Sequence, residues 1–175
     1  MPVTRIVIVG ATVALALSLP FYGKTWNLLM HHVGAVVFMG NLIVSAAWMS
    51  LARRSRSVET LRLGARGVVL TDAIFTSPGA LLLLLNGGIL GTPFFQSGAR
   101  WLFLSIALFL VSGILWLAVL VPVQKRLALL LERVPVGGAV PAECDALLKR
   151  WFRVGGIAAL LPLATLVLMV VKPNF

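Results

Sequence analysis

Long runs of apolar residues constrain this chain more than any other feature. The hydrocarbon core of a bilayer is about 30 Å thick, so a helix needs about 20 apolar residues to cross it, and a helix satisfies its own backbone hydrogen bonds there. The sequence therefore predicts an all-α transmembrane helix bundle, with residues 1–175 as a single membrane domain. The five expected spans cover about residues 3–21, 27–51, 66–86, 100–123 and 152–171.

Composition excludes the other common classes. Hydrophobic residues make up 60% of the 175 residues and charged residues 11%, and the mean hydropathy is +1.04. A soluble domain of this length does not sustain such values. The apolar runs also lack the alternation of a transmembrane β-strand, so the chain is expected to be a multi-pass membrane protein with helical spans.

The first expected span resembles a signal peptide, because Arg5 precedes an apolar stretch. No A-x-A-type cleavage site precedes Phe21. We therefore expect a retained helix that ends at Pro20 and is additional to a four-helix core over about residues 27–173.

Basic residues predict the orientation, because they are enriched in short cytoplasmic loops. Twelve of the fifteen lie inside if the N-terminus is cytoplasmic and the C-terminus is outside. Those twelve are Arg5, Arg53, Arg54, Arg56, Arg62, Arg66, Lys125, Arg126, Arg133, Lys149, Arg150 and Arg153, whereas Lys24, Arg100 and Lys172 lie outside. Topology and attraction to anionic lipid thus account for the net charge of +10, with no nucleic-acid partner.

Few ionisable groups lie within the expected spans, and a charge at the bilayer centre is costly. They are the adjacent His31 and His32 and the single acid Asp72. Steps of three and four residues from His31 pass through Asn41 and Ser45, so this polar stripe is expected to face other helices. The stripe of His32 is otherwise apolar, which makes His31 the better candidate for a buried role.

An outer-face cluster of His31 with Met169, Arg100 and Lys172 follows if the second, fourth and fifth spans are neighbours. Haem iron takes a histidine ligand, and basic side chains suit its propionates. Copper(I) takes histidine and methionine ligands. His32 points about 100° away from His31 on a helix, so one ion cannot take both. The ordinary alternative is that the histidines hydrogen-bond and the methionine fills a gap.

Asp72 has two alternative readings. It either carries a proton, in a solute or proton carrier, or it hydrogen-bonds structurally to Ser45, Asn41 or Thr71. No second acid, G-x-S-x-G, H-E-x-x-H or C-x-x-C motif accompanies it, so no catalytic residue is predicted. The stretch "GGILG" is expected to be a turn rather than a phosphate loop, and the single Cys144 to be inert.

Four stretches together resemble a family of small, largely uncharacterised bacterial integral-membrane proteins. They are "LLMHHVGAVVFMGNL", "TDAIFTSPGALLLL", "RWLFLSIALFLVSGILWLAVLVPVQKRL" and "KRWFRVGGIAALLPLATLVLMVVKP". The family looks related to the copper-resistance-D-like proteins and to the small membrane protoporphyrinogen oxidase that binds haem b. The resemblance implies a histidine of its first helix, here His31 or His32, used for haem or copper. The oxidase adds a lysine in a later helix, which the fourth span here lacks.

Two function classes follow from these observations. The first is a protein that binds haem b or copper near the outer face, with a redox or metal-handling role and His31 as ligand. The second is a non-catalytic accessory subunit or assembly factor, packed in a larger membrane complex such as a respiratory enzyme, or in a homo-oligomer. The small residues Gly155 and Ala159, four apart, suit such packing.

Overall fold

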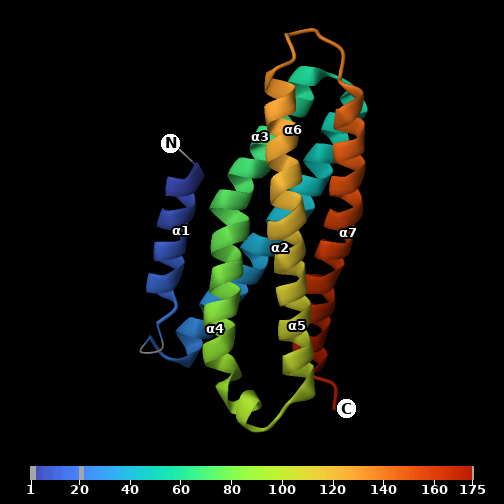
Figure 1. Cartoon of the computed structure of the whole chain (residues 1–175). Coiled ribbons are helices and arrows are strands. Elements are labelled where there is room, and N and C mark those ends of the chain that lie inside the picture. The colour runs from blue at the N-terminus through green and yellow to red at the C-terminus, as the bar shows by residue number, and fades with distance from the viewer. Residues whose placement is uncertain (1–2, 20–21, 175) are drawn as a thin grey trace. The chain divides into compact units, whose positions relative to one another are not determined.

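The computed structural model describes residues 3–19 and 22–174, and within these ranges every regular element is helical (Figure 1). In chain order the elements are α1 Val3–Leu17, α2 Lys24–Ser55, α3 Val58–Thr71, the π-helical segment η2 Asp72–Thr76, α4 Ser77–Gln96, α5 Arg100–Leu115, the π-helical segment η3 Trp116–Leu120, α6 Val121–Glu132 and α7 Ala142–Val171. The all-α class is confirmed.

Four helices are long and apolar enough to cross a membrane: Lys24–Ser55, Val58–Gln96, Arg100–Glu132 and Ala142–Val171. They contain the four expected spans of the core. The first helix, Val3–Leu17, is apolar but only 15 residues long, so its crossing stays a prediction. The expected end of that helix, Pro20 and Phe21, lies outside the described residues.

The four core helices are longer than the expected spans, and one predicted turn is wrong. The stretch "GGILG", residues 87–91, lies inside α4, which continues to Gln96 with Pro93 within it. Backbone groups have no water to bind in lipid, and this favours a continued helix over a turn despite the glycines. The break between α6 and α7 falls where "VPVGGAVP" predicts it.

Each π-helical segment begins six residues before a proline. Asp72 precedes Pro78, and Trp116 precedes Pro122. Proline lacks a backbone N–H and its ring clashes with the carbonyl four residues earlier, so the turn before it widens. The backbone N–H of Ser77 accordingly donates to the carbonyl of Asp72, five residues back.

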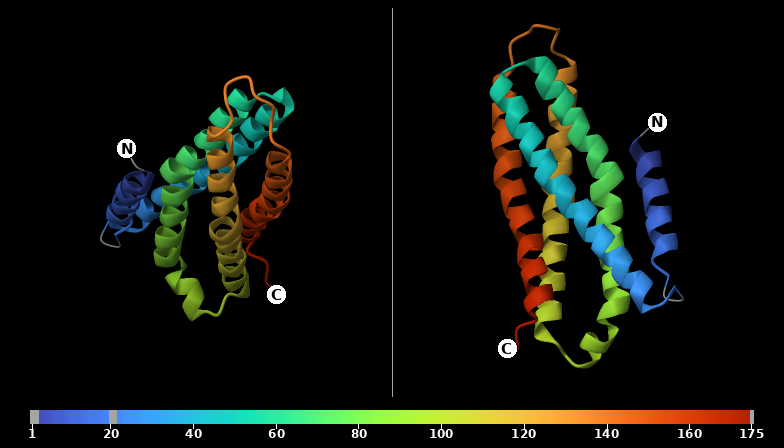
Figure 2. Two further views of the ribbon diagram at one scale, coloured as in Figure 1. Left: turned by 45° about the horizontal axis from the view of Figure 1, so that its top comes forward. Right: turned by 180° about the vertical axis from the view of Figure 1, so that it is seen from behind.

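The chain divides into two compact units. Unit 1 contains residues 1–47 and 70–97, and unit 2 contains residues 48–69 and 98–175. In unit 1, α1 packs along α4 (Figure 2). Gly10 meets Pro78, where an added Cβ would lie 2.7 Å from the proline Cγ. The amide of Asn86, in α4, donates to Ser18 Oγ over 2.7 Å. This bond holds the C-terminal end of α1 against α4.

Two glycines bring the backbones of α2 and α4 together in unit 1. A Cβ added to Gly34 would lie 2.9 Å from the carbonyl oxygen of Gly79 and 3.0 Å from the backbone nitrogen of Leu83. Only glycine fits so close to another backbone. Small residues of this kind drive helix contacts in membranes, where the hydrophobic effect between helices is lost.

Unit 2 has an apolar core between its helices. The largest of its fully buried side chains are Met49, Leu61, Leu127, Leu131 and Leu148. Hydroxyl groups add bonds between α5 and α7, since Ser112 Oγ donates to the Ala158 carbonyl over 2.7 Å and Thr165 Oγ1 donates to the Ser105 carbonyl over 3.2 Å.

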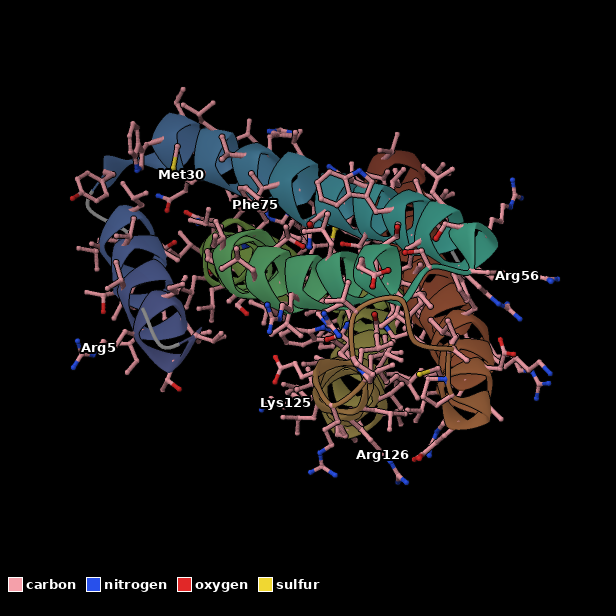
Figure 3. The ribbon with its side chains drawn as sticks, turned by 90° about the horizontal axis from the view of Figure 1, so that it is seen from above. Arg5, Met30, Arg56, Phe75, Lys125 and Arg126 are labelled. Atoms are coloured by element: carbon pink, nitrogen blue, oxygen red, sulfur yellow. The ribbon has the colours of Figure 1, made fainter. Side chains whose placement is uncertain are left out.

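The two basic loops that the sequence predicts, residues 53–66 and 125–153, meet at one end of unit 2, and the structure folds most of both into helices. Arg62 donates to the carbonyls of Leu131, at 2.9 Å, and Val134, at 2.6 Å, so it caps the last turn of α6. The backbone N–H of Gly137 donates to Glu59 Oε1 over 2.8 Å. Figure 3 shows Arg56 and Arg126 directed away from the helices at this end.

Candidate functional site

His31 packs against α4 within unit 1. Its Nδ1 lies 3.1 Å from the carbonyl oxygen of Leu83. A carbonyl only accepts hydrogen bonds, so Nδ1 carries the proton and Nε2 keeps its lone pair free. Gly87 makes room for the ring, because an added Cβ there would lie 3.0 Å from Cε1 of His31. The imidazole is thereby held in one orientation and one tautomer.

His32 is held differently. Its Nδ1 lies 2.8 Å from the carbonyl of Leu28 in its own helix, and the side chain is exposed. The two imidazole centroids are 6.3 Å apart and their planes are inclined by 75°. The two rings therefore have different partners, one on α4 and one on α2.

Two buried asparagines, Asn27 and Asn86, were not among the site residues that the sequence predicts. Asn27 lies one helical turn before His31, and Asn86 directly precedes Gly87. Both are almost fully buried, and the Oδ1 atom of each has no hydrogen-bond partner among the described residues. An asparagine within an apolar span at a step of four from a histidine is the signal that finds Asn27.

Asp72 forms the centre of a second polar group in unit 1. Asn41 Nδ2 donates to Asp72 Oδ1 over 3.1 Å, and Thr76 Oγ1 donates to the same oxygen over 2.8 Å. Asn41 Nδ2 also lies 2.8 Å from Thr76 Oγ1. Ser45 Oγ donates to Asn41 Oδ1 over 3.4 Å and lies 3.5 Å from Thr71 Oγ1.

The burial of this group fits its bonding. Asp72, Asn41, Ser45 and Thr76 are all buried, and buried polar groups are normally hydrogen-bonded. Of the hydrogen-bond partners expected for Asp72, Asn41 bonds to it directly. Ser45 bonds to Asn41 and so reaches Asp72 only indirectly. The widened turn of η2 carries both Asp72 and Thr76, and such turns are frequent at functional sites.

The remaining predicted site residues lie in unit 2. Arg100 begins α5 and is exposed, and Met169 is partly buried in the last turn of α7. Lys172 caps α7 in the left-handed conformation with φ 46°, and its Nζ lies 5.7 Å from the ring centroid of Trp101. Arg100 and Lys172 therefore share one end of unit 2. Their grouping with His31, which belongs to unit 1, stays a prediction.

Metal-binding side chains are sparse in the described part of the chain. No three His, Cys, Asp or Glu residues gather there in a group that would hold a metal ion. Cys144 is fully buried in the apolar core of unit 2.

Comparison with known proteins identifies the family. No curated protein and no solved structure matches the chain. Residues 27–173 match the family described as "Predicted integral membrane protein (DUF2269)". The match leaves out only the first 26 residues and the last two. The chain therefore belongs to this family of predicted integral membrane proteins.

Proposed function

We propose that the chain is a multi-pass protein of the bacterial inner membrane with its N-terminus inside and its C-terminus outside. The contact between the two basic loops of unit 2 supports this orientation, because one cytoplasmic end then holds both. We further propose α1 as a short fifth span. Its 15 residues are about 22 Å long, and a bilayer accommodates such a helix by local thinning.

We propose that unit 1 binds haem b through Nε2 of His31, in a protein with a redox role. The observation that carries this proposal is the bond between His31 Nδ1 and the Leu83 carbonyl. Histidines that bind metals commonly donate their second ring N–H to a carbonyl, which fixes the tautomer and makes the other nitrogen a better ligand. His32 has an equivalent bond but an exposed ring without support from a second helix.

The ligand count favours haem over copper. A porphyrin supplies four of the iron ligands, so one protein imidazole is enough to hold it. A copper(I) ion needs two or three soft protein ligands. The methionine next to the site, Met30, instead packs with Ala14 and Leu82. Copper held by His31 and a methionine such as Met169 is the alternative.

The described residues indicate what the chain itself contributes to such a site. A bound haem b supplies one-electron redox chemistry. His31 provides the ligand through Nε2. The carbonyl of Leu83 accepts the hydrogen bond from Nδ1–H of His31, and Gly87 leaves space for the imidazole ring. The resemblance to the haem-binding oxidase and to the copper-resistance-D-like proteins agrees with this proposal. The lysine that the oxidase uses has no counterpart within α5, so oxidase activity forms no part of the proposal.

A difference spectrum of dithionite-reduced minus oxidised protein, together with metal analysis, tests the proposal. Purified protein is expected to show a Soret band and bound iron, and His31→Ala is expected to lose both while His32→Ala keeps them. A matched glycine pair tests the geometry. Gly87→Ala pushes on the His31 ring and is expected to lower haem content, whereas Gly88→Ala, with nothing within 4 Å of its added Cβ, leaves haem content unchanged.

Several outcomes would contradict the proposal. Well-folded protein without a Soret band ends the haem claim, and copper found by metal analysis supports the alternative ligand set. Protein that carries neither group, and that co-migrates in mild detergent with a defined larger complex, supports the accessory subunit or assembly factor instead.

A further inference from the structure

The outward face of α7 has a basic hollow at the end where α6 and α7 are joined. The hollow has a volume of about 460 Å³ and is lined by Ala146, Lys149, Arg150, Arg153 and Val154. All five residues lie on one side of α7, at steps of three and four residues. From this hollow, its free charge and the apolar surface beside it, we infer that α7 binds an anionic phospholipid, with the headgroup phosphate held by Lys149, Arg150 and Arg153.

The first support is that these three cations are free of ion pairs within the described residues. Two other cations of unit 2 are engaged in ion pairs. Arg66 pairs with Glu132 at 3.0 Å, and Arg126 pairs with Glu143. By contrast Lys149, Arg150 and Arg153 are exposed and make no ion pair in the part of the chain that the structure describes.

The acids at this end of unit 2 do not neutralise the hollow. Glu59 accepts from the backbone of Gly137 and from Ser57 Oγ, and the pairs just named engage Glu132 and Glu143. Asp145 lies one turn before Lys149 without an ion pair to it. Unit 2 carries eleven basic residues in and beside its two loops against four acids, Glu59, Glu132, Glu143 and Asp145, a surplus of seven positive charges.

The second support is an apolar stripe that continues from the hollow along the same face of α7. Steps of three and four from Arg153 reach Ile157, Leu160 and Val167, which are 56%, 64% and 58% exposed. The distance from Arg153 to Val167 along the helix is about 21 Å, and one leaflet of hydrocarbon is about 15 Å deep. The face therefore offers cations to a phosphate and apolar side chains to the acyl chains attached to it.

This combination fits a phospholipid better than the other anions. Free phosphate uses the cations alone, and a nucleic acid gains nothing from exposed aliphatic side chains. Each basic residue near an anionic membrane surface is worth about 1 kcal/mol, or about a fivefold preference for anionic over zwitterionic lipid. Phosphatidylglycerol is accordingly expected to bind this face in preference to phosphatidylcholine. The inference is independent of His31 and of haem.

Native mass spectrometry of the full-length protein in detergent, with equal amounts of phosphatidylglycerol and phosphatidylcholine, tests this site. Wild type is expected to retain mainly phosphatidylglycerol. The triple variant Lys149→Gln, Arg150→Gln, Arg153→Gln is expected to lose this preference, by about fivefold for each charge removed. A charge-matched control, Arg54→Gln, Arg56→Gln, Lys125→Gln, removes the same number of cations from the same end of the unit and is expected to keep the preference.

Each other outcome would overturn the inference. Equal losses in the two triple variants would show diffuse attraction by net charge instead of a site. Displacement of the lipid by inorganic phosphate would assign the hollow to free phosphate. Binding of an oligonucleotide that the hollow triple variant abolishes, without a lipid preference in wild type, would assign it to nucleic acid. Circular dichroism and gel filtration confirm that both triple variants fold.

Discussion

The two units of the chain bury different kinds of side chain. Among the described residues, unit 1 has seven of the ten buried polar side chains, and unit 2 has three. The seven are Ser18, Asn27, Asn41, Ser45, Asp72, Thr76 and Asn86. The apolar clusters are distributed in the opposite way, with fourteen buried members in unit 2 and three in unit 1.

This difference separates scaffold from candidate site. A polar group buried without a partner destabilises a fold, so apolar packing alone gives the more stable unit. Unit 2 comes closer to that rule, since its one unpartnered buried polar atom among the described residues is Nε1 of Trp151, and it keeps most of its charge at its surface. Unit 1 keeps an acid, three amides and a histidine among its helices, two of them with unpartnered oxygens. Such groups are expected where the chain binds something, which is why both the haem proposal and the Asp72 group belong to unit 1.

The two π-helical segments, one in each unit, differ in the same way as the units do. Both arise six residues before a proline, but η2 reads "DAIFT" and η3 reads "WLAVL". The same backbone device thus carries a hydrogen-bonded acid in unit 1 and no charged side chain in unit 2. Proline explains why each turn widens, and the side chains decide what the widened turn does.

The largest expected effect on stability comes from adding a side chain at Gly34, where α2 and α4 are in close contact. An added Cβ at Gly34 would lie 2.8 Å from Leu82 Cβ, and backbone atoms of α4 are equally close. Gly34→Ala is expected to lower the free energy of unfolding in micelles by about 3 kcal/mol, because α2 and α4 must separate. In Gly40→Ala, where the added Cβ has nothing within 4 Å, the free energy of unfolding should stay within about 0.5 kcal/mol of wild type. Equal effects of the two changes would contradict the close packing.

A smaller loss is expected when the acid of unit 1 is removed. Asp72→Ala deprives Asn41 and Thr76 of their acceptor, and we expect unfolding in micelles to become easier by about 2 kcal/mol. Asp72→Asn keeps an acceptor oxygen of the same shape and should cost less than half as much. If Asp72 instead carries protons, Asp72→Asn leaves stability nearly unchanged but abolishes proton uptake into proteoliposomes, so the two assays together separate a structural role from a transport role.

Much of this architecture could be predicted from the sequence, because apolar length and basic loops are read directly from residues. The four core helices and the polar stripe of His31 and Asn41 follow from helical periodicity alone. The turn expected at "GGILG" is wrong, because glycine propensities measured in water do not hold in lipid. The bond from His31 to Leu83 and the space at Gly87 could not be predicted, since both depend on which helices pack together. Asn86 escaped notice as a site residue for the same reason, because its partner Ser18 is 68 residues away.

The two prolines provide a direct test of the π-helical segments. Pro78→Ala restores a backbone N–H and lets η2 return to an α-helical turn, which rotates Asp72 away from Asn41 and leaves a gap at Gly10. We expect a loss of about 1 kcal/mol in the free energy of unfolding. Pro122→Ala displaces no buried acid in η3 and should cost less than Pro78→Ala. A loss in Pro122→Ala as large as in Pro78→Ala would show that the widened turn itself stabilises the helix, whatever side chains it carries.

The smallest effect is expected at the surface of unit 2. The ion pair between Arg66 and Glu132 is exposed, with side chains 60% and 42% accessible. Exposed pairs are screened by solvent and salt, so Arg66→Gln should change the free energy of unfolding by less than about 1 kcal/mol, and less still at high ionic strength. Arg62→Gln, one turn earlier, removes the bonds that cap α6 and should cost more, with little dependence on salt. Measuring both variants at low and high salt therefore distinguishes a solvated ion pair from a helix cap. A salt-independent loss of stability in Arg66→Gln would contradict the solvated pair and would show that Arg66 stabilises the fold of unit 2.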